Sequence, residues 1–413
     1  MKSPFQQNSQ LGILISVMFI YITGLGLLIP ALPFMVYTSG GNKFESAVVF
    51  TIFSGCAFLS APFWGFLSDK IGRKKVLLLS ALGTIIGYVY LGLSSNVSEI
   101  FLSRAIAGLS AGWLIASQSI ISDVTTPEER TRAMGFLGAA FGVGFTLGPL
   151  STGIILSDWV EWFPTSTNPF STLSFIAGFL SFVAGIIVYF KLKETQHKKN
   201  IDKTHFIKLF YHPSLRFLFT TYSIIFIIFT TIEASFALWC LDLFGFGAME
   251  IGFLLGITAL VSAFIQGGLL GKLKQYFSEN KLIVFSALSL LSALILLIII
   301  KFLIQHEEQQ SFDSFSFMLA MGPILLVAIA MSLHNPIMSS LVSQIAPQNL
   351  KGSALSGIQL CSSFARIIGP AWAGLIYQHW GSNILYIITL SFGLLYLWIW
   401  HTDSAKPFLL NHK

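Results

Sequence analysis

The sequence predicts an all-α integral membrane protein with 12 transmembrane helices in two pseudo-symmetric six-helix bundles. Three observations lead to this fold class. First, 54% of the 413 residues are hydrophobic and 10% are charged, whereas a soluble domain has about 25% charged residues. Second, the apolar residues fall into 12 long runs, and most cations fall into alternate gaps between them. Third, the two halves of the chain share short patterns at a constant spacing.

The first apolar run, residues 11–37, contains no Asp, Glu, Lys, Arg or His. About 20 apolar residues suffice to cross a bilayer as a helix. The run is too long for a secretory signal and no small-residue cleavage site follows it, so we expect it to be retained as the first span. The other predicted spans are 46–68, 76–95, 98–122, 135–157, 172–191, 215–240, 250–271, 282–303, 314–344, 352–378 and 382–400.

The cations follow the alternation of these spans. With a cytoplasmic N-terminus, 20 of the 24 Lys and Arg residues fall on the cytoplasmic side. Lys43 and Lys301 fall outside, and Arg104 and Arg366 lie within spans. This asymmetry predicts a multi-pass protein of the cytoplasmic (inner) membrane with both termini in the cytoplasm. It also explains the sequence pI of about 9.1 without a nucleic-acid partner.

The predicted domains follow the longest polar stretch. We expect an N-terminal bundle at 1–191, a cytoplasmic loop at 192–214, a C-terminal bundle at 215–400 and a cytoplasmic tail at 401–413. The pattern GFLSDKIGRKK after the second run matches GKLKQYFSENK after the eighth, 206 residues later, through Gly65 and Gly271, Leu67 and Leu273, and Lys75 and Lys281. Such duplication of six spans is known among secondary transporters.

A charged cluster stands between the second and third spans. It contains Asp69, Lys70, Arg73, Lys74 and Lys75 and the two glycines Gly65 and Gly72. Gly65 is expected to allow close helix approach and Gly72 a sharp turn, while the cations hold the loop at the cytoplasmic face. Asp69 can meet a loop cation or a helix N-terminus. The alternative is a loop that only sets topology, which leaves Asp69 and the glycines unexplained.

Two further spans carry unusual residues. Arg104 lies inside the fourth span, four and eight residues before Gly108 and Gly112. A cation there normally faces a cavity or a partner, although snorkelling to the outer surface is the alternative. The fifth span is rich in glycine, with Gly144, Gly148 and Pro149 near its end. Glycines spaced by four residues favour close helix packing, and proline can bend the helix.

With these residues in view, the chain resembles the major facilitator superfamily over nearly its whole length. GFLSDKIGRKK fits the family signature G-x-L-x-D-x-x-G-R-[RK]-[RK], and RAIAGLSAG resembles the signature R-x-x-x-G-x-x-x-G. The end of the fifth span resembles the glycine and proline signature of antiporters. GLGLLIPALP (24–33) and SDVTTPEERTRAMGF (122–136) are similar to 12-span drug/proton antiporters, which include tetracycline and multidrug efflux transporters.

This resemblance implies a central cavity lined by spans one, four, seven and ten, and an inner gate that Asp69 holds. Many tetracycline exporters carry an acid three residues before the first glycine of GLGLLIPALP, where this chain has Tyr21. That difference puts tetracycline itself in doubt as the substrate.

A proton-driven transporter needs a group inside the membrane that gains and loses a proton. Of the 18 acidic residues, only Glu233 falls well inside a predicted span. We predict that Glu233 contacts Arg104 across the two halves and couples proton movement to the outer gate. The alternative is that Glu233 points to the outer interface and only caps local polarity. His334 is a second proton candidate, and Pro336 is expected to break the tenth span.

Pockets for amphipathic ligands are mostly apolar with few polar groups. Arg366 could face substrate or brace the fold. The predicted cavity residues are Tyr21, Gln118, Phe226, Phe229, Trp239, Gln266, Asn335, Gln359 and Arg366.

The sequence therefore predicts a proton-coupled exporter of amphipathic, drug-like small molecules. A carrier for one metabolite, such as a siderophore or nutrient, and a transport-dead receptor or scaffold are the alternatives. We expect no enzyme activity, because GGLLGKL (267–273) lacks the glycine spacing and the Ser or Thr of a phosphate-binding loop. We also expect no cofactor beyond the proton gradient, no metal and a monomer. The three cysteines are too far apart for a metal or disulfide pattern.

Overall fold

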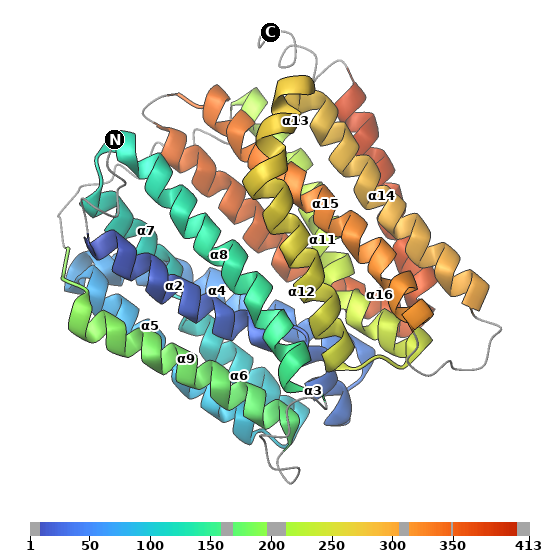
Figure 1. Ribbon diagram of the computed structural model, residues 1–413, viewed down its shortest axis with the longest axis horizontal. Helices are drawn as coiled ribbons and strands as arrows, with labels where there is room; N and C mark the ends of the chain where they lie inside the picture. The colour runs from blue at the N-terminus through green and yellow to red at the C-terminus, as the bar shows by residue number, and fades with distance from the viewer. Residues whose placement is uncertain (1–8, 158–167, 196–211, 305–313, 348–349, 403–413) are drawn as a thin grey trace. The chain divides into compact units, whose positions relative to one another are not determined.

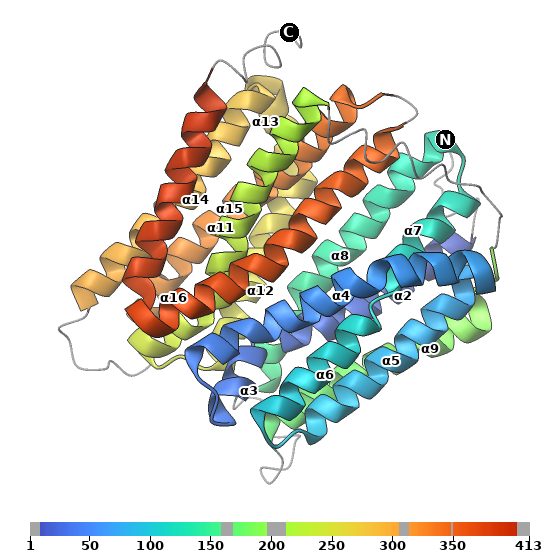
Figure 2. The ribbon, with the colours of Figure 1, turned by 180° about the vertical axis from the view of Figure 1, so that it is seen from behind.

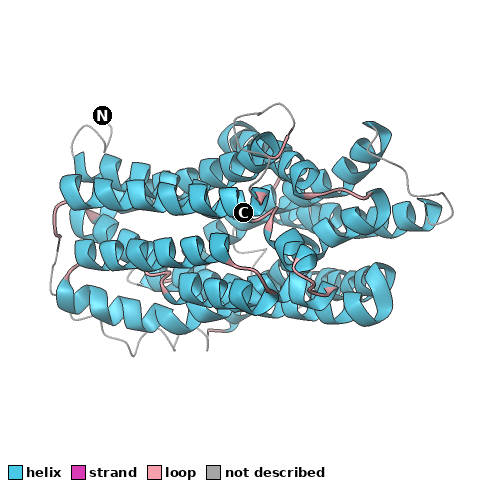
Figure 3. Ribbon diagram, turned by 90° about the horizontal axis from the view of Figure 1, so that it is seen from below, coloured by secondary structure: helices cyan, strands magenta, loops and turns pink. Residues whose placement is uncertain are grey.

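The computed structural model describes residues 9–157, 168–195, 212–304, 314–347 and 350–402. Every regular element within these ranges is helical (Figure 3). Over these residues, 11 helices or helix runs are long and apolar enough to cross a membrane. The predicted all-α integral membrane fold is therefore confirmed.

The described part of the first half of the chain contains the helices α2 to α9. In chain order they are α2 (Ser9–Leu28), α3 (Leu32–Thr38), α4 (Lys43–Ile71), α5 (Arg73–Leu93), α6 (Val97–Leu109), α7 (Trp113–Val124), α8 (Pro127–Ile155) and α9 (Pro169–Lys191). The first predicted span is thus divided into α2 and α3 around Pro30, and the fourth into α6 and α7.

The second half consists mainly of long helices. They are α11 (Pro213–Phe244), α12 (Ala248–Phe264), the π-helix η1 (Ile265–Leu269), α13 (Leu270–Tyr276), α14 (Glu279–Ile304), α15 (Ser314–Ile345) and α16 (Lys351–His401). The eighth predicted span contains α12, η1 and α13. Contrary to expectation, α15 runs unbroken past Pro336. Membrane-spanning helices tolerate proline where neighbouring groups satisfy the freed backbone carbonyl.

The difference between 11 and 12 spans lies in α16. This element has 51 residues, about 77 Å at 1.5 Å per residue, which is more than twice the ~30 Å of a bilayer core. Gly381 interrupts it with φ 79° and ψ 173°. Division at Gly381 gives the two last predicted spans and restores the count of 12.

By its internal contacts the chain divides into two compact units. The first contains residues 1–199 and 247–259, and the second contains 200–246 and 260–413. The start of α12 therefore packs with the first unit and its end with the second. The predicted division into two six-helix bundles stays a prediction.

Side-chain caps explain where several helices begin. Asn42 accepts a hydrogen bond from the Glu45 N–H, and the Glu45 carboxylate accepts one from the Asn42 N–H. Thr126 and Glu129 form the same reciprocal capping box at the start of α8. These caps satisfy N–H groups that a helix N-terminus leaves unpaired.

Small residues set the packing of the first unit. Helix α2 lies along α8 (Figure 1), and Gly26 faces Gly144 and Gly148. A methyl group added at Gly148 would lie only 2.6 Å from the carbonyl carbon of Gly26. Helix α4 lies along α6 (Figure 2), where an added Gly108 Cβ would come within 2.5 Å of the Phe53 carbonyl oxygen. Glycine at these points lets the backbones approach in a medium that gives little hydrophobic drive.

Candidate functional site

Arg73 is the centre of the charged cluster between α4 and α5. Its guanidinium lies 2.6 Å from the Asp69 carboxylate and 3.3 Å from the Asp123 carboxylate at the end of α7. The side chains of Arg73 and Asp123 are 7% and 8% exposed, whereas that of Asp69 is 58% exposed. The cluster therefore combines a buried ion pair with one carboxylate that faces outward.

Glu194 completes this cluster from beyond the end of α9. Its carboxylate accepts the backbone N–H groups of Arg73 at 2.7 Å and Lys74 at 3.2 Å. An anion at a helix N-terminus is favourable because the N–H groups there carry a partial positive charge. Gly72 lies against the same carboxylate, because a Cβ at this position would overlap Glu194. Its φ of 107° is also a backbone conformation that favours glycine.

The other predicted gate residues are placed less tightly. The Lys74 ammonium donates to the Tyr189 carbonyl at 2.7 Å, and Lys75 is exposed. The close helix approach predicted at Gly65 is not seen, because an added Cβ would meet nothing within 4 Å. The structure adds Asp123 and Glu194 to the predicted gate residues. Both acids lie at the ends of predicted spans, and this position in the sequence is what could have identified them as gate residues.

Arg104 lies inside the first unit and is 1% exposed. Its guanidinium carbon is 5.2 Å from the centre of the Tyr88 ring, and its Nε donates weakly to the Ser103 hydroxyl at 3.4 Å. One guanidinium nitrogen, the NH2 atom, has no hydrogen-bond partner. The alternative of snorkelling to the surface is thereby excluded for this conformation.

The helix break after Arg104 explains the two glycines of its signature. Besides the Gly108 contact with α4, an added Gly112 Cβ would come within 2.5 Å of the Trp64 ring. The break leaves backbone carbonyls without helical partners. Three side chains of α4 and α5 donate to them, namely Ser60 to Gly108, Trp64 to Leu109 and Ser80 to Ser110.

The signature of the fifth span is a packing surface against α2 and α12. A Cβ added at Gly144 would lie 2.7 Å from the Ile22 side chain. The Thr152 hydroxyl donates a hydrogen bond to the Leu27 carbonyl near the end of α2. On the other side, an added Gly252 Cβ would lie 2.7 Å from the Pro149 carbonyl oxygen. These contacts join α8 to both neighbouring helices near its C-terminal end.

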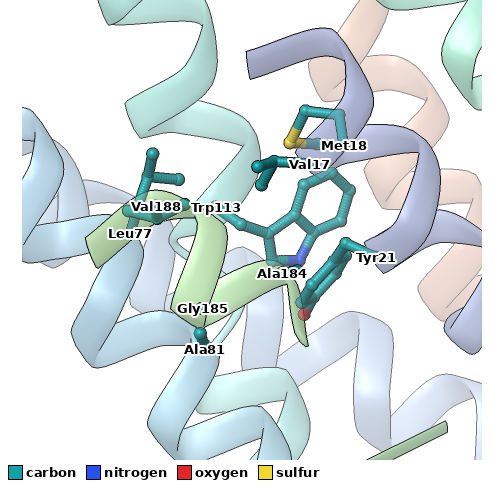
Figure 4. A pocket seen from close by; sticks show the side chains of 9 residues that line it. All are labelled: Val17, Met18, Tyr21, Leu77, Ala81, Trp113, Ala184, Gly185 and Val188. Carbon is teal, nitrogen blue, oxygen red and sulfur yellow. The ribbon is translucent and has the colours of Figure 1, made fainter. Parts of the chain in front are cut away.

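Tyr21 lies in the interior of the first unit rather than facing open space. It is 4% exposed, and its hydroxyl shares a 2.8 Å hydrogen bond with Thr84. Its ring packs on Trp113, with the two ring centres 4.6 Å apart. Figure 4 shows these rings beside a small apolar cavity between α2, α5, α7 and α9. The lining residues are Val17, Met18, Tyr21, Leu77, Ala81, Trp113, Ala184, Gly185 and Val188.

Glu233 forms an ion pair in the second unit. Its carboxylate accepts a hydrogen bond from the Arg366 guanidinium at 3.0 Å, and the two side chains are 27% and 41% exposed. Glu233 lies on the long α11, 11 residues before its end at Phe244, and Arg366 lies near the middle of the part of α16 before Gly381. Arg366 is thus the partner of Glu233 here. The predicted contact of Glu233 with Arg104 would join the two units and stays a prediction.

Aromatic rings surround this pair on α11. The Arg366 guanidinium carbon is 5.4 Å from the centre of the Phe226 ring, and Phe229 packs edge-on against Phe226. Phe226 is 5% exposed and Phe229 is partly exposed. Trp239, in contrast, is 0% exposed, so in this structure it belongs to the helix core and does not line an open cavity.

His334 is fully buried among α14, α15 and α16. Its Nδ1 shares a hydrogen bond with the Ser286 hydroxyl at 3.1 Å, and its Nε2 has no partner. The His334 ring packs against the rings of Tyr222 and Tyr396, with 6.1 Å and 6.0 Å between the ring centres. The neighbouring Asn335 is partly buried, with an unpaired Oδ1. Both residues precede Pro336 within the continuous α15, so the predicted break of the tenth span at this place is wrong.

The remaining polar candidates are exposed glutamines. Gln118 on α7, Gln266 in η1 and Gln359 on α16 all present their side chains at the surface of a span. Amides that face lipid without a partner are costly, so each of these side chains is expected to need water or a polar neighbour. Gln266 lies in the π-helix η1, and π-helical turns occur often at functional sites.

Sequence reasoning missed one further acid. Asp242, near the C-terminal end of α11, accepts a hydrogen bond from the Tyr377 hydroxyl of α16 at 2.9 Å. No group of three or more His, Cys, Asp or Glu residues suited to a metal occurs in the described ranges.

Comparisons with known proteins agree with this architecture. The family model of the Major Facilitator Superfamily matches residues 14–370. Multidrug resistance protein 2 of Bacillus subtilis is 27% identical over 91% of this chain and 91% of its own length. The class B tetracycline resistance protein of Escherichia coli is 26% identical over 97% of each chain. The crystal structure of the human organic anion transporter TETRAN matches with a TM-score of 0.68 and 20% identity, over 96% of this chain and 100% of that one.

Proposed function

Because the chain belongs to the Major Facilitator Superfamily, we propose that this transporter exports amphipathic, drug-like small molecules in exchange for protons by alternating access. The curated relatives named above are multidrug and tetracycline resistance proteins, which supports the export of such molecules. The glycine and proline contacts at the end of α8 fit the antiporter signature that the sequence resembles.

The Glu233–Arg366 ion pair is the observation that carries the proposal. Charged side chains in the middle of a span are costly and usually mark a transport pathway or a proton relay. Both side chains are partly exposed, at 27% and 41%, so the pair is not sealed inside the helix packing.

The coupling step then follows from charge. While Glu233 is ionised, it holds Arg366 through an ion pair and a hydrogen bond. A proton on Glu233 removes the charge attraction and frees the guanidinium. Because Arg366 lies on α16 and Glu233 on α11, the change alters the contact between two long helices of the second unit. Protonation thus biases the conformational equilibrium that exposes the substrate to one side or the other.

The surroundings of this pair suit an amphipathic ligand. The Phe226 ring lies beside the Arg366 guanidinium, and the Phe229 ring packs against Phe226. Gln359 lies two turns before Arg366 on the same helix and is exposed. An apolar surface with few polar groups is the usual composition of such pockets.

Two elements of the proposal concern placement in the membrane. The cation asymmetry of the loops favours the cytoplasmic (inner) membrane with both termini in the cytoplasm. The Asp69–Arg73–Asp123 cluster is then the inner gate, with the exposed Asp69 carboxylate as the part that can exchange partners.

The test is accumulation of a panel of dyes and antibiotics in efflux-deficient bacteria that express the chain, with and without a protonophore. We expect lower accumulation that the protonophore restores. Glu233→Gln is expected to abolish the protonophore-sensitive part. Glu279→Gln is the matched control, because Glu279 lies at the start of α14 in a partly exposed pair with Lys274.

Proton-driven export that survives Glu233→Gln would sink the coupling role of this residue. Absence of export for every compound in the wild type would favour a carrier for one metabolite, and metabolite profiling would then identify its substrate. Absence of any energy-dependent flux in that profiling would leave a receptor or scaffold.

A further inference from the structure

Arg104 is a buried cation for which the described side chains of its own unit offer no counter-charge. It is 1% exposed and has an unpaired guanidinium nitrogen. The cation–π contact with Tyr88 offsets part of the cost of removing the charge from water, but it does not neutralise that charge. A buried charge of this kind is normally paired.

The carboxylates of the first unit are occupied elsewhere. Seven of them have described side chains, and each engages a helix N-terminus, Ser95 or Arg73. They are Glu45, Asp69, Glu99, Asp123, Glu129, Glu194 and Glu250. The anion that compensates Arg104 must therefore come from outside this set.

The immediate surroundings of Arg104 are built from neutral groups that can assist an anion. The Ser103 hydroxyl lies 3.4 Å from its Nε, and the Tyr88 ring lies beside its guanidinium. Both neighbours are almost fully buried. Guanidinium groups bind carboxylates through paired, charge-assisted hydrogen bonds, so a free nitrogen in this setting suits one carboxylate oxygen.

The helix break next to Arg104 offers a route of access. Helix α6 ends at Leu109, and the carbonyls of the break are held by side-chain donors of α4 and α5 rather than by a helical ladder. Discontinuous helices form the binding sites of many transporters, because their ends and unwound backbone face the ligand. Arg104 lies on α6, five residues before its last residue, Leu109.

We propose that Arg104 binds the carboxylate of the transported molecule, so that the substrates of this transporter include amphipathic acids and zwitterions. The assignment rests on the proposed transport function and adds a substrate class to it. Since Arg104 is buried in the present conformation, the carboxylate reaches it when the helices around the break separate during the transport cycle.

The first arm of the test measures binding without transport. The full-length protein in lipid nanodiscs is melted in a low-salt buffer free of carboxylates with increasing sodium benzoate, and in parallel with sodium chloride. A saturating rise of the melting temperature with benzoate is expected, because a ligand that binds the folded state stabilises it. Arg104→Gln should lose the rise, and Arg104→Lys should keep part of it. Lys272→Gln, at an exposed cation of α13, should behave as the wild type.

The second arm measures selectivity with a matched pair of dyes, rhodamine B, which carries a carboxylate, and its ethyl ester. Arg104→Gln is expected to lower export of the acid about tenfold more than export of the ester, given the strength of charged hydrogen bonds. The remaining ester export shows that the variant is folded and active.

Three results would overturn the proposal. The first is a wild type with no saturating benzoate effect. The second is an equal effect of chloride and benzoate, which would indicate an inorganic anion. The third is an equal loss of acid and ester export in Arg104→Gln, which would indicate an internal partner such as Glu233. If the wild type exports neither dye and benzoate still binds through Arg104, the failure lies in the proposed export function and not in the carboxylate site.

Discussion

The loop between α4 and α5 and the loop between α13 and α14 occupy equivalent positions in the two halves, 206 residues apart. The first residue of the following helix is Arg73 in one and Glu279 in the other. Arg73 is enclosed by the carboxylates of Asp69 and Asp123, and Glu194 lies beside its backbone. Glu279 is met by the Lys274 ammonium, by the Ser340 hydroxyl and by the Gln344 amide.

The sign of one charge explains the difference between these loops. A cation in the first turn of a helix lies against the positive end of the helix dipole. Arg73 therefore depends on nearby carboxylates, one of which also satisfies the N–H groups of the turn. An acid in the first turn is favourable by itself, so Glu279 needs only one cation and two neutral donors. The first loop is thus a buried electrostatic cluster, and the second is a partly exposed cap.

The largest expected difference between the loops is the effect of removing Arg73. Arg73→Gln leaves the Asp123 carboxylate, which is 8% exposed, without its charged partner. Breaking such a buried pair costs about 3 kcal/mol or more. Thermal unfolding of the purified protein should show a clear fall in melting temperature. An unchanged melting temperature would mean that the cluster contributes no more than a surface pair.

The next largest effect concerns the turn before each helix. Gly72→Ala places an L-residue at φ 107° and ψ 157°, a region that glycine alone adopts readily, at a cost of about 1–3 kcal/mol. The new methyl group also displaces the Glu194 carboxylate. The matched variant is Ser278→Ala in the other loop, with an expected cost of about 1 kcal/mol or less. Equal melting temperatures for the two variants would contradict this comparison.

A smaller effect on stability is expected at Asp69. Its side chain is 58% exposed, so Asp69→Asn should change stability by less than about 1 kcal/mol. If Asp69 holds the inner gate, the same variant should still slow export of the dyes named above. Normal transport together with normal stability would remove Asp69 from the gate.

The smallest expected effect is in the second loop. The Lys274 and Glu279 side chains are 32% and 25% exposed at 2.8 Å, and Lys274→Gln should cost between about 0 and 1 kcal/mol. High salt should remove most of that difference, because exposed ion pairs are screened. A loss as large as that of Arg73→Gln would show that both loops are buried electrostatic clusters.

The sequence alone was sufficient to predict the fold class, one turn and one acid inside a span. Apolar runs of span length predicted the all-α membrane fold, and the glycine at position 72 predicted a turn that the structure has. Elimination among the acids identified Glu233 as the one well inside a span. These predictions succeeded because they depend on local properties: hydrophobic length, backbone conformation and the cost of charge in a membrane.

The tertiary structure decided which residues meet. Glu233 pairs with Arg366, 133 residues away, and Arg73 receives Glu194 from beyond α9. Burial removed Trp239 and Tyr21 from an open cavity, and α15 stayed whole past Pro336 while the fourth span broke. Partner choice depends on where distant backbones place their side chains, and the periodicity of one segment contains no information on its neighbours. The sequence therefore determined which charges lie in the membrane, and the packing of the helices determined what each of them binds.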